Sequence, residues 1–334
     1  MKLVTYSKNG KEQLAFYIDN RLYDTNAAGP QLPATMKELL EHWERDMPQM
    51  ERVESYLKRG KLDVKGVPYP EAEVLAPVPH PTSCRDGYAF RQHVAAARRN
   101  RKVDMIPEFD QYPIFYFTNH NAIQGPGIIP AMPDHFKKLD FELEAAIVIC
   151  RKGRNIKAED ADQYIGGYMI MNDMSARTLQ MEEMLLNLGP AKGKDFCTVT
   201  GPMLVTPDEL ESFKKPAKVN HGGNAYNLKM TCSVNGVQVS EGNMGDMDWT
   251  FAEIIERCAY GVDILPGDVI GSGTVGTGCF LELNGTARLN DPGAQDQWLE
   301  DNDVVEMEIE GLGLLTNRIK AEKTDWSILA LKKK

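Results

Sequence analysis

The clearest pattern of apolar and polar positions lies in the stretch 140-DFELEAAIVIC-150. Ala145 to Cys150 is an unbroken apolar run that ends at two basic residues, which predicts a short buried strand. Glu142 and Glu144 are two positions apart, and alternate residues of a strand share one face. An exposed sheet edge would also accommodate two glutamates, but the apolar flank favours an interior position. Because two like charges are costly to bury together, this pattern predicts a positive group between them.

The beginning of the chain predicts a small antiparallel sheet followed by a helix. Two apolar strands flank a turn at Lys8–Lys11, and a second turn is expected at Asp19-Asn20. Thr35, with a glutamate three positions later, forms a capping-box pattern that predicts a helix start. We expect this helix to cover residues 36–60, with an interruption at Pro48 and an end at the final glycine.

A proline-rich segment then divides the chain. The stretch 68-PYPEAEVLAPVPHP-81 holds five prolines and predicts a stiff, extended domain boundary. We therefore expect a small N-terminal α/β domain over residues 1–75 and a main domain over residues 76–334. Because the main part is rich in glycines and strand patterns, the predicted fold class is α+β with mostly β-structure.

Composition narrows the classes of partner. The 334 residues carry a net charge of -10 and a pI near 5.2, which argues against binding to a nucleic-acid backbone. The basic clusters 98–102 and 332–334 are therefore interpreted as solvated surface. No apolar run approaches the roughly 20 residues of a membrane span, and Met1–Thr5 does not open a signal peptide. Six widely spaced cysteines without a CxxC pair are typical of reduced thiols in a cytoplasmic protein.

Three further segments hold candidate chemistry. In a helix over residues 85–99, Asp86 and His93 would lie seven positions apart on one face, although for this segment alone an exposed amphipathic helix is the better explanation, because helical spacing is common. Asp173 follows an apolar strand pattern and could cap a short helix instead of serving a site. Lys194 lies in a glycine-rich turn, where a lysine usually faces solvent.

The glycine-rich stretch 271-GSGTVGTG-278 is not a nucleotide-binding loop. It lacks the GK[ST] ending of a P-loop, and we expect the following residues 279–283 to continue as a strand rather than to open a helix. Glycines that permit close backbone approach instead favour a loop lining a small-molecule pocket.

Taken together, the acidic candidates form a set without a histidine or cysteine: Asp86, Glu142, Glu144 and Asp173. Hard oxygen ligands suit Mg²⁺, Ca²⁺ or Mn²⁺ better than zinc. A divalent cation would neutralise the two glutamates that share a strand face.

These residues resemble the motifs of the fumarylacetoacetate hydrolase family. Its acidic pair matches Glu142 and Glu144 in 138-KLDFELE-144, and its next ligand matches Asp173 in 172-NDMSAR-177. Its first ligand and its histidine, seven residues apart and ending in R-Q-H, match Asp86 and His93. Further motifs match Gln180, Lys194 after Leu-Gly-Pro, Thr274 in S-G-T and Glu282 in L-E-L, together with Tyr88 and Tyr116 on the substrate side.

The resemblance covers roughly residues 75–320 and implies a layered mixed-sheet (β-roll) catalytic domain that forms a homodimer. It implies metal-dependent hydrolysis of a carbon–carbon bond in a 1,3-diketone acid such as 4-fumarylacetoacetate, giving fumarate and acetoacetate. Mg²⁺ is the expected ion, with Mn²⁺ or Ca²⁺ as alternatives.

The resemblance also implies a role for each site residue. His93 would be the base, Glu282 would orient it, and Lys194 would stabilise developing charge. The expected substrate contacts are Tyr88, Tyr116, Arg177, Gln180 and Thr274, with one basic residue among Arg98, Arg99, Arg101 and Lys102.

Two alternatives compete with this interpretation. The first is another reaction on the same scaffold: hydrolysis of another acylpyruvate, or decarboxylation or isomerisation of a 2-oxo acid. The second is a catalytically silent metal-binding module, but it should have lost the His93 and Glu282 pair, which is present here.

Overall fold

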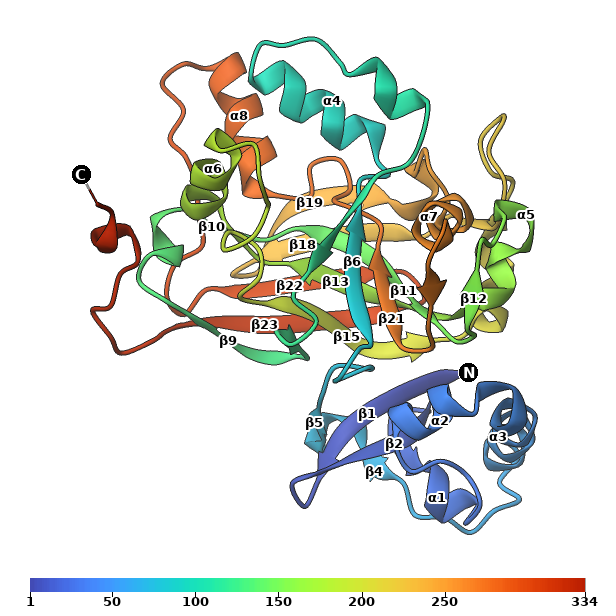
Figure 1. Cartoon of the computed structure of the whole chain (residues 1–334). Coiled ribbons are helices and arrows are strands. Elements are labelled where there is room, and N and C mark those ends of the chain that lie inside the picture. Colours follow the sequence, from blue (N-terminus) through green and yellow to red (C-terminus); the bar gives the residue numbers. More distant parts are fainter. Residues whose placement is uncertain (334) are drawn as a thin grey trace.

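The computed structural model describes residues 1–333; Lys334, the end of the basic tail, lies outside the described residues. Two β-sheets dominate it, with helices α4, α6 and α8 gathered on one side and the N-terminal elements at the opposite end (Figure 1). The two sheets pack on each other, as the predicted layered fold requires. The fold class of mixed, layered sheets is therefore confirmed.

The larger sheet is mixed and has twelve strands. Its central strand β11 covers Leu143–Ile149, and all seven of its residues are buried, as the apolar run predicted. The strand order along the sheet is β4 (Val67–Pro68), β3 (Arg21–Asp24), β2 (Lys11–Ile18), β1 (Lys2–Lys8), β15 (Thr198–Val205), β13 (Ile165–Asp173), β11, β21 (Asp268–Gly271), β6 (Ser83–Gly87) and β7 (Phe115–Thr118), with β5 (Glu73–Val74) on β1 and β8 (Ile123–Gln124) on β15.

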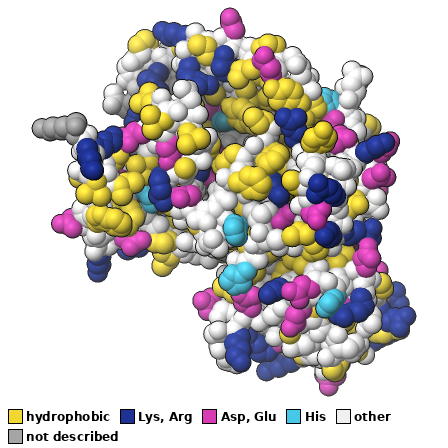
Figure 2. Space-filling view, in the orientation of Figure 1, with side chains coloured by type: hydrophobic (Ala, Val, Ile, Leu, Met, Phe, Trp, Pro, Cys, Tyr) yellow, Lys and Arg dark blue, Asp and Glu magenta, His cyan; other side chains and the backbone are white. Residues whose placement is uncertain are grey.

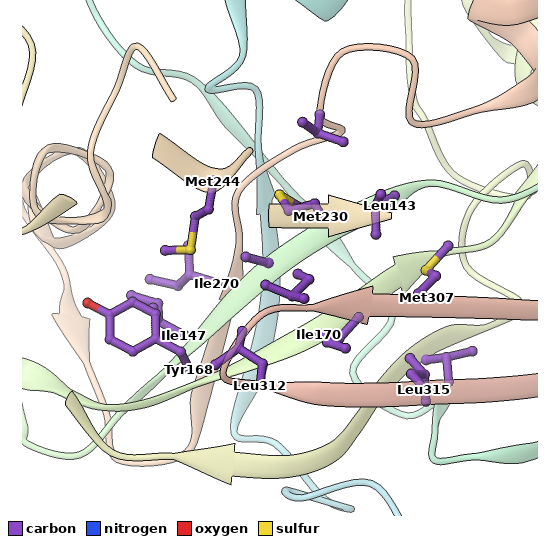
Figure 3. Close-up of a cluster of buried hydrophobic side chains, with 14 of the residues drawn as sticks. Leu143, Ile147, Tyr168, Ile170, Met230, Met244, Ile270, Met307, Leu312 and Leu315 are labelled. Atoms are coloured by element: carbon purple, nitrogen blue, oxygen red, sulfur yellow. The ribbon is translucent and has the colours of Figure 1, made fainter. Parts of the chain in front are cut away.

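The second sheet has five strands in the order β19 (Val237–Asn243), β18 (Lys229–Val234), β22 (Val304–Ile309), β23 (Gly313–Ala321) and β9 (Gly127–Ala131). Its apolar face packs against the larger sheet (Figure 3). Ile147 and Ile170 of the larger sheet share one buried cluster with Met230, Met307 and Leu315 of the smaller one. Alternate residues of each strand thus fill a common core.

The N-terminal hairpin follows the sequence pattern. Strands β1 and β2 pair from Leu3–Phe16 to Lys8–Lys11, and Asn9 and Gly10 at the turn have φ of 55° and 73°. Both residues tolerate positive φ, as a two-residue hairpin turn requires. Strand β1 also pairs with β15, so the first strands continue the large sheet. The division between residues 75 and 76 stays a prediction.

The long N-terminal helix is interrupted, but not where we predicted. The capping box is present, with Thr35 and Glu38 bonded reciprocally at the start of α2 (Met36–Glu41). The chain breaks at His42, and Pro48 lies inside the next helix, α3 (Trp43–Lys58). A proline six residues into a helix removes one hydrogen bond without ending it, so the interruption expected at Pro48 was wrong.

The remaining helices are α1 (Thr25–Ala28), α4 (Arg91–Asn100), α5 (Ala158–Ala161), α6 (Arg177–Leu185), α7 (Phe251–Ala259) and α8 (Phe280–Asn290). The helix predicted over residues 85–99 begins only at Arg91, whose N–H donates to Asp248 at 2.8 Å. Asp86 instead belongs to strand β6, which pairs with β21 and β7. The shared helix face proposed for Asp86 and His93 was therefore wrong, because Asp86 pairs with strands from distant segments instead of joining the helix.

The strand predicted over residues 279–283 was also wrong, since helix α8 begins there. The carboxylate of Asp140 accepts hydrogen bonds from the first two helical N–H groups, Phe280 at 2.8 Å and Leu281 at 3.0 Å. Such a cap satisfies donors that would otherwise be orphaned at a helix start. The capping residue lies 140 positions away along the chain, so no local sequence pattern predicts the start of this helix.

The surface carries charges of both signs. Figure 2 shows Lys and Arg side chains interspersed with Asp and Glu over the visible face, with hydrophobic patches between them. Among residues 1–333, no helix is both long and apolar enough to cross a membrane. All six cysteines are buried and unpaired.

Candidate active site

Four carboxylates converge at one end of neighbouring interior strands of the large sheet. Asp86 lies near the end of β6, Glu144 lies in β11, Asp173 ends β13, and Glu142 immediately precedes β11. One oxygen from each lies within 4.8 Å of the others, and all four residues are buried. The sheet order β13-β11-β21-β6 brings them together, which is the set that the sequence predicted.

A glycine makes this convergence sterically feasible. Gly271 of β21 is paired with Ala146 on one side and with Asp86 on the other. A Cβ at Gly271 would lie 2.4 Å from Asp86 Oδ1 and 3.0 Å from Glu144 Oε2. Any other residue would therefore fill the space into which the two carboxylates point.

Two buried cations compensate part of the negative charge. Lys194 Nζ donates to Asp173 at 2.8 Å and also to Glu142, while Arg177 bonds Glu142 and Asp140, each at 2.8 Å. Burial alone would raise the pKa of Glu142, but the charges of Lys194 and Arg177 outweigh it and lower this pKa to about 2. Burial opposes the charge of Lys194, yet Asp173 and Glu142 raise the pKa of this ammonium. Lys194 is thus a fixed positive charge rather than a base.

Among residues 1–333, Asp86 and Glu144 have no such cationic partner. Burial and the charge of Asp173 raise the pKa of Asp86 to about 7. Burial, with the charges of Asp86 and Glu142, raises the pKa of Glu144 well above its usual range. Glu144 Oε2 and Asp173 Oδ1 are buried and accept no hydrogen bond from the described residues. Buried carboxylate oxygens without donors, in a cluster with excess negative charge, fit a divalent cation with oxygen ligands.

A histidine and a glutamate form a buried pair beside this cluster. His93 comes from α4 and Glu282 from the first turn of α8, and His93 Nδ1 lies 2.6 Å from Glu282 Oε2. The other carboxylate oxygen of Glu282 accepts from Thr277 N at 3.0 Å. A ligating atom of His93 lies within 4.8 Å of a Glu142 oxygen. The imidazole is therefore held by Glu282 with its ring beside the carboxylates.

The residues predicted on the substrate side also lie around this site. Tyr116 donates its hydroxyl to Asp173, and Thr274 donates to Glu144 at 3.3 Å. Gln180 accepts from Arg177 at 3.0 Å, and the Tyr88 ring packs edge-on to His93 with centroids 6.0 Å apart. The glycine-rich loop that carries Thr274 thus lines the site, as the sequence indicated.

The four basic candidates differ in position. Arg98 and Arg101 bond backbone carbonyls of their own segment, at 2.6 and 3.2 Å, and Lys102 is exposed. Arg99 alone among them reaches toward α8, where it lines a cavity of about 370 Å³ that Glu282 also borders. Of the four, only Arg99 lines this cavity together with Glu282.

Two residues beside the site were missed. Asp140 alternates with Glu142 and Glu144, so the same strand periodicity could have found it. Cys279 lies within reach of His93 and Glu142, and nothing in its local sequence signals this.

The fold and the site define a class of protein: layered mixed sheets that carry a buried carboxylate cluster for a divalent cation and an adjacent histidine–glutamate pair. The chain belongs to the fumarylacetoacetate hydrolase family, as the resemblance implied. The profile described as fumarylacetoacetate (FAA) hydrolase C-terminal matches residues 82–320, and fumarylacetoacetase N-terminal domain 2 matches residues 1–80.

Several relatives have been named or solved. Oxaloacetate tautomerase FAHD2A, mitochondrial, of Bos taurus is 31% identical over 305 residues, covering 89% of this chain and 83% of that protein. Fumarylacetoacetate hydrolase from Exiguobacterium antarcticum has a TM-score of 0.68 at 23% identity, covering 96% of this chain and 100% of that one. A maleylpyruvate hydrolase from Sphingobium, in complex with manganese (II) and pyruvate, has a TM-score of 0.67 at 20% identity, covering 97% and 100%. At these identities the solved structures establish the shared fold.

Proposed function

We propose that this enzyme hydrolyses a carbon–carbon bond in a 1,3-diketone acid such as 4-fumarylacetoacetate, giving fumarate and acetoacetate. The observation that carries the proposal is the buried His93–Glu282 pair, at 2.6 Å, beside the carboxylate cluster. A base that is already oriented next to a cation site is what activation of water requires.

Asp86, Glu142, Glu144 and Asp173 would hold the cation, for which we propose Mg²⁺, with Mn²⁺ and Ca²⁺ as the alternatives. When bound, a divalent cation supplies Lewis acidity that polarises a substrate carbonyl.

His93 takes a proton from water, and the resulting hydroxide oxygen bonds to the carbonyl carbon of the substrate. Glu282 is bonded to Nδ1 of the ring, so Nε2 is the nitrogen that accepts the proton and returns it. The carbon–carbon bond then breaks, its electron pair leaves with the departing carbon, and His93 returns the proton to that carbon. Water is consumed and two acids are formed.

Lys194 supplies positive charge where negative charge develops on substrate oxygen. Its raised pKa and its two carboxylate partners fix it as an ammonium inside the site. Gln180 and Arg177 act with it, because Arg177 holds the Gln180 amide at 3.0 Å. Tyr88, Tyr116 and Thr274 surround the same space and would contact substrate.

A second candidate is keto–enol tautomerisation of a 2-oxo acid such as oxaloacetate. The relatives named oxaloacetate tautomerase favour it, since three of them are 31% identical over at least 88% of this chain. The same imidazole would then move a proton between carbon and oxygen, with no attack by water.

One assay separates the two reactions. The purified enzyme with Mg²⁺ is given fumarylacetoacetate, fumarylpyruvate, acetylpyruvate and oxaloacetate, and each product is analysed by mass in ¹⁸O-labelled water. Hydrolysis yields two acids with ¹⁸O in one new carboxyl group. Conversion of oxaloacetate enol at unchanged mass, with every diketone left intact, would replace the hydrolase proposal by the tautomerase.

We also propose that the enzyme acts as a cytoplasmic homodimer. Leu185, Leu186 and Leu188, at and beyond the end of α6, are 82%, 81% and 79% exposed. Monomers rarely expose large contiguous apolar patches. Acidic Glu182 and basic Lys332 form an ion pair next to these leucines. The rim of the apolar patch therefore carries charges of both signs and can complement the same surface of a second copy. The buried, unpaired cysteines fit a reducing compartment.

A further inference from the structure

Beside the carboxylate cluster lies a second group of potential ligands with different chemistry. One ligating atom each from His93, Cys279 and Glu142 lies within 4.8 Å of the other two, and all three residues are buried. The hydrolytic reaction described above gives the Cys279 thiol no role. Imidazole, thiolate and carboxylate are together the donor set that zinc prefers, whereas Mg²⁺ prefers oxygen alone.

The partners of these three residues match those of a zinc site. Histidine ligands of zinc typically give their second ring nitrogen to a carboxylate, and His93 Nδ1 is held by Glu282 at 2.6 Å. Nε2 has no hydrogen-bond partner among residues 1–333 and is free to ligate. Glu142 is likewise oriented, by Arg177 at 2.8 Å and by Lys194, and a carboxylate has lone pairs beyond those two bonds.

Cys279 lies at the start of a helix. Cys279 immediately precedes α8, a helix of eleven residues, and the N-terminus of a helix favours negative charge. A soft cation binds this sulfur as a thiolate, so its binding releases the thiol proton to solvent and leaves a thiolate ligand.

We propose that His93, Cys279 and Glu142 form a second, soft-metal site, which takes Zn²⁺ and thereby inhibits the enzyme. Zinc bound to Nε2 occupies the nitrogen that handles the proton, so the base is lost while the hard-cation site keeps Asp86, Glu144 and Asp173. The inhibition rests on the proposed function of His93, whereas the binding does not. Three protein ligands leave one zinc position open, and Glu142 is shared between the two sites.

Binding is tested on the full chain loaded with Mg²⁺, with Co²⁺ as a spectroscopic substitute for zinc. One equivalent of Co²⁺ should produce a thiolate-to-cobalt charge-transfer absorption in the near ultraviolet, which Zn²⁺ then removes. Cys279→Ala and Cys279→Ser should both lack the band, and Cys258→Ala, a buried cysteine in α7, should keep it. Glu282→Gln should weaken Zn²⁺ binding by about 10–100-fold, the usual effect of losing the residue behind a histidine ligand.

Inhibition is measured separately, against each variant's own zinc-free rate. Zn²⁺ should inhibit the parent enzyme at the concentration at which it displaces Co²⁺, and Cys279→Ser should need roughly 100-fold more. A Co²⁺ complex without the thiolate band, or a band that survives in both Cys279 variants, overturns the site. If the band behaves as expected but Zn²⁺ leaves turnover unchanged, the site stands and the role of His93 as base is wrong. Thermal melting of each variant shows that it is folded before binding is scored.

Discussion

Replacement of Asp86 by asparagine should stabilise the cation-free protein at neutral pH. The carboxyl of Asp86 is buried, and its neighbours Glu144 and Asp173 are also acidic. The introduced amide would keep an acceptor for Gly273 N, now bonded to Asp86 Oδ1 at 3.0 Å, and would remove one buried charge. An amide here imitates the protonated carboxyl that the buried site favours.

The magnitude follows from the pKa of Asp86, which burial and Asp173 raise from 3.8 to about 7. A folded pKa above the unfolded one means that the native state binds the extra proton. The stabilisation that comes from protonating Asp86 is therefore complete below about pH 4, and it is lost as pH rises through about 7. This shift of about three units corresponds to about 4 kcal/mol, an upper value because Asp86, Glu144 and Asp173 titrate together.

The assay is urea unfolding in EDTA between pH 4 and pH 8. The parent protein should lose stability across this window, and Asp86→Asn should lose less, so that it is the more stable protein at pH 7. Mg²⁺ added at 100 times its dissociation constant should raise the free energy of unfolding of the parent protein by about 2.7 kcal/mol. It should raise that of the variant much less.

Asp268→Asn is the matched control. Asp268 is equally buried but is paired with Arg85 at 3.2 Å, so removing its charge leaves Arg85 uncompensated and should destabilise the protein by about 3–5 kcal/mol. If Asp86→Asn also destabilises the cation-free protein at pH 7, or keeps the full effect of Mg²⁺, the cluster is not a cation site held together by its ion.

Three further outcomes are expected. Chelation should abolish turnover and Mg²⁺ or Mn²⁺ should restore it; full activity in a verified metal-free preparation would count against the cation. His93→Ala should lower kcat/KM by about 10²–10⁴-fold without changing Mg²⁺ binding, and combining it with Glu282→Gln should add little, since the two act as one unit; additive losses would separate them. Leu185→Glu should shift the protein from dimer to monomer in analytical ultracentrifugation, whereas Leu314→Glu, at an exposed leucine of β23, should not; an unchanged dimer would place the interface elsewhere.

Local chemistry made some features predictable. The strand β11 could be predicted from its apolar run because burial of consecutive apolar residues dominates over weaker propensities. The capping box of Thr35 and the positive φ of Asn9 and Gly10 depend only on residues a few positions apart. Alternation likewise brought Glu142 and Glu144 to one place, where both help to form the carboxylate cluster.

Long-range contacts decided what local patterns could not. Helix α8 starts where Asp140 caps it from 140 positions away, and strand pairing with β21 removes Asp86 from the helix that carries His93. The residues of the site were recognised in the sequence through motifs. A motif identifies these residues, but it does not show on which helix or strand each one lies.

The sequence by itself determined that two glutamates lie two positions apart at the start of a buried strand and therefore need positive charge, because strand alternation and the cost of burying charge are local rules. Only the tertiary structure decided how that charge is balanced. Lys194 and Arg177 neutralise Glu142, whereas Asp86 and Glu144 remain uncompensated over Gly271. The physical reason is that electrostatic energy depends on distances in space, and here those distances join segments that lie far apart along the chain.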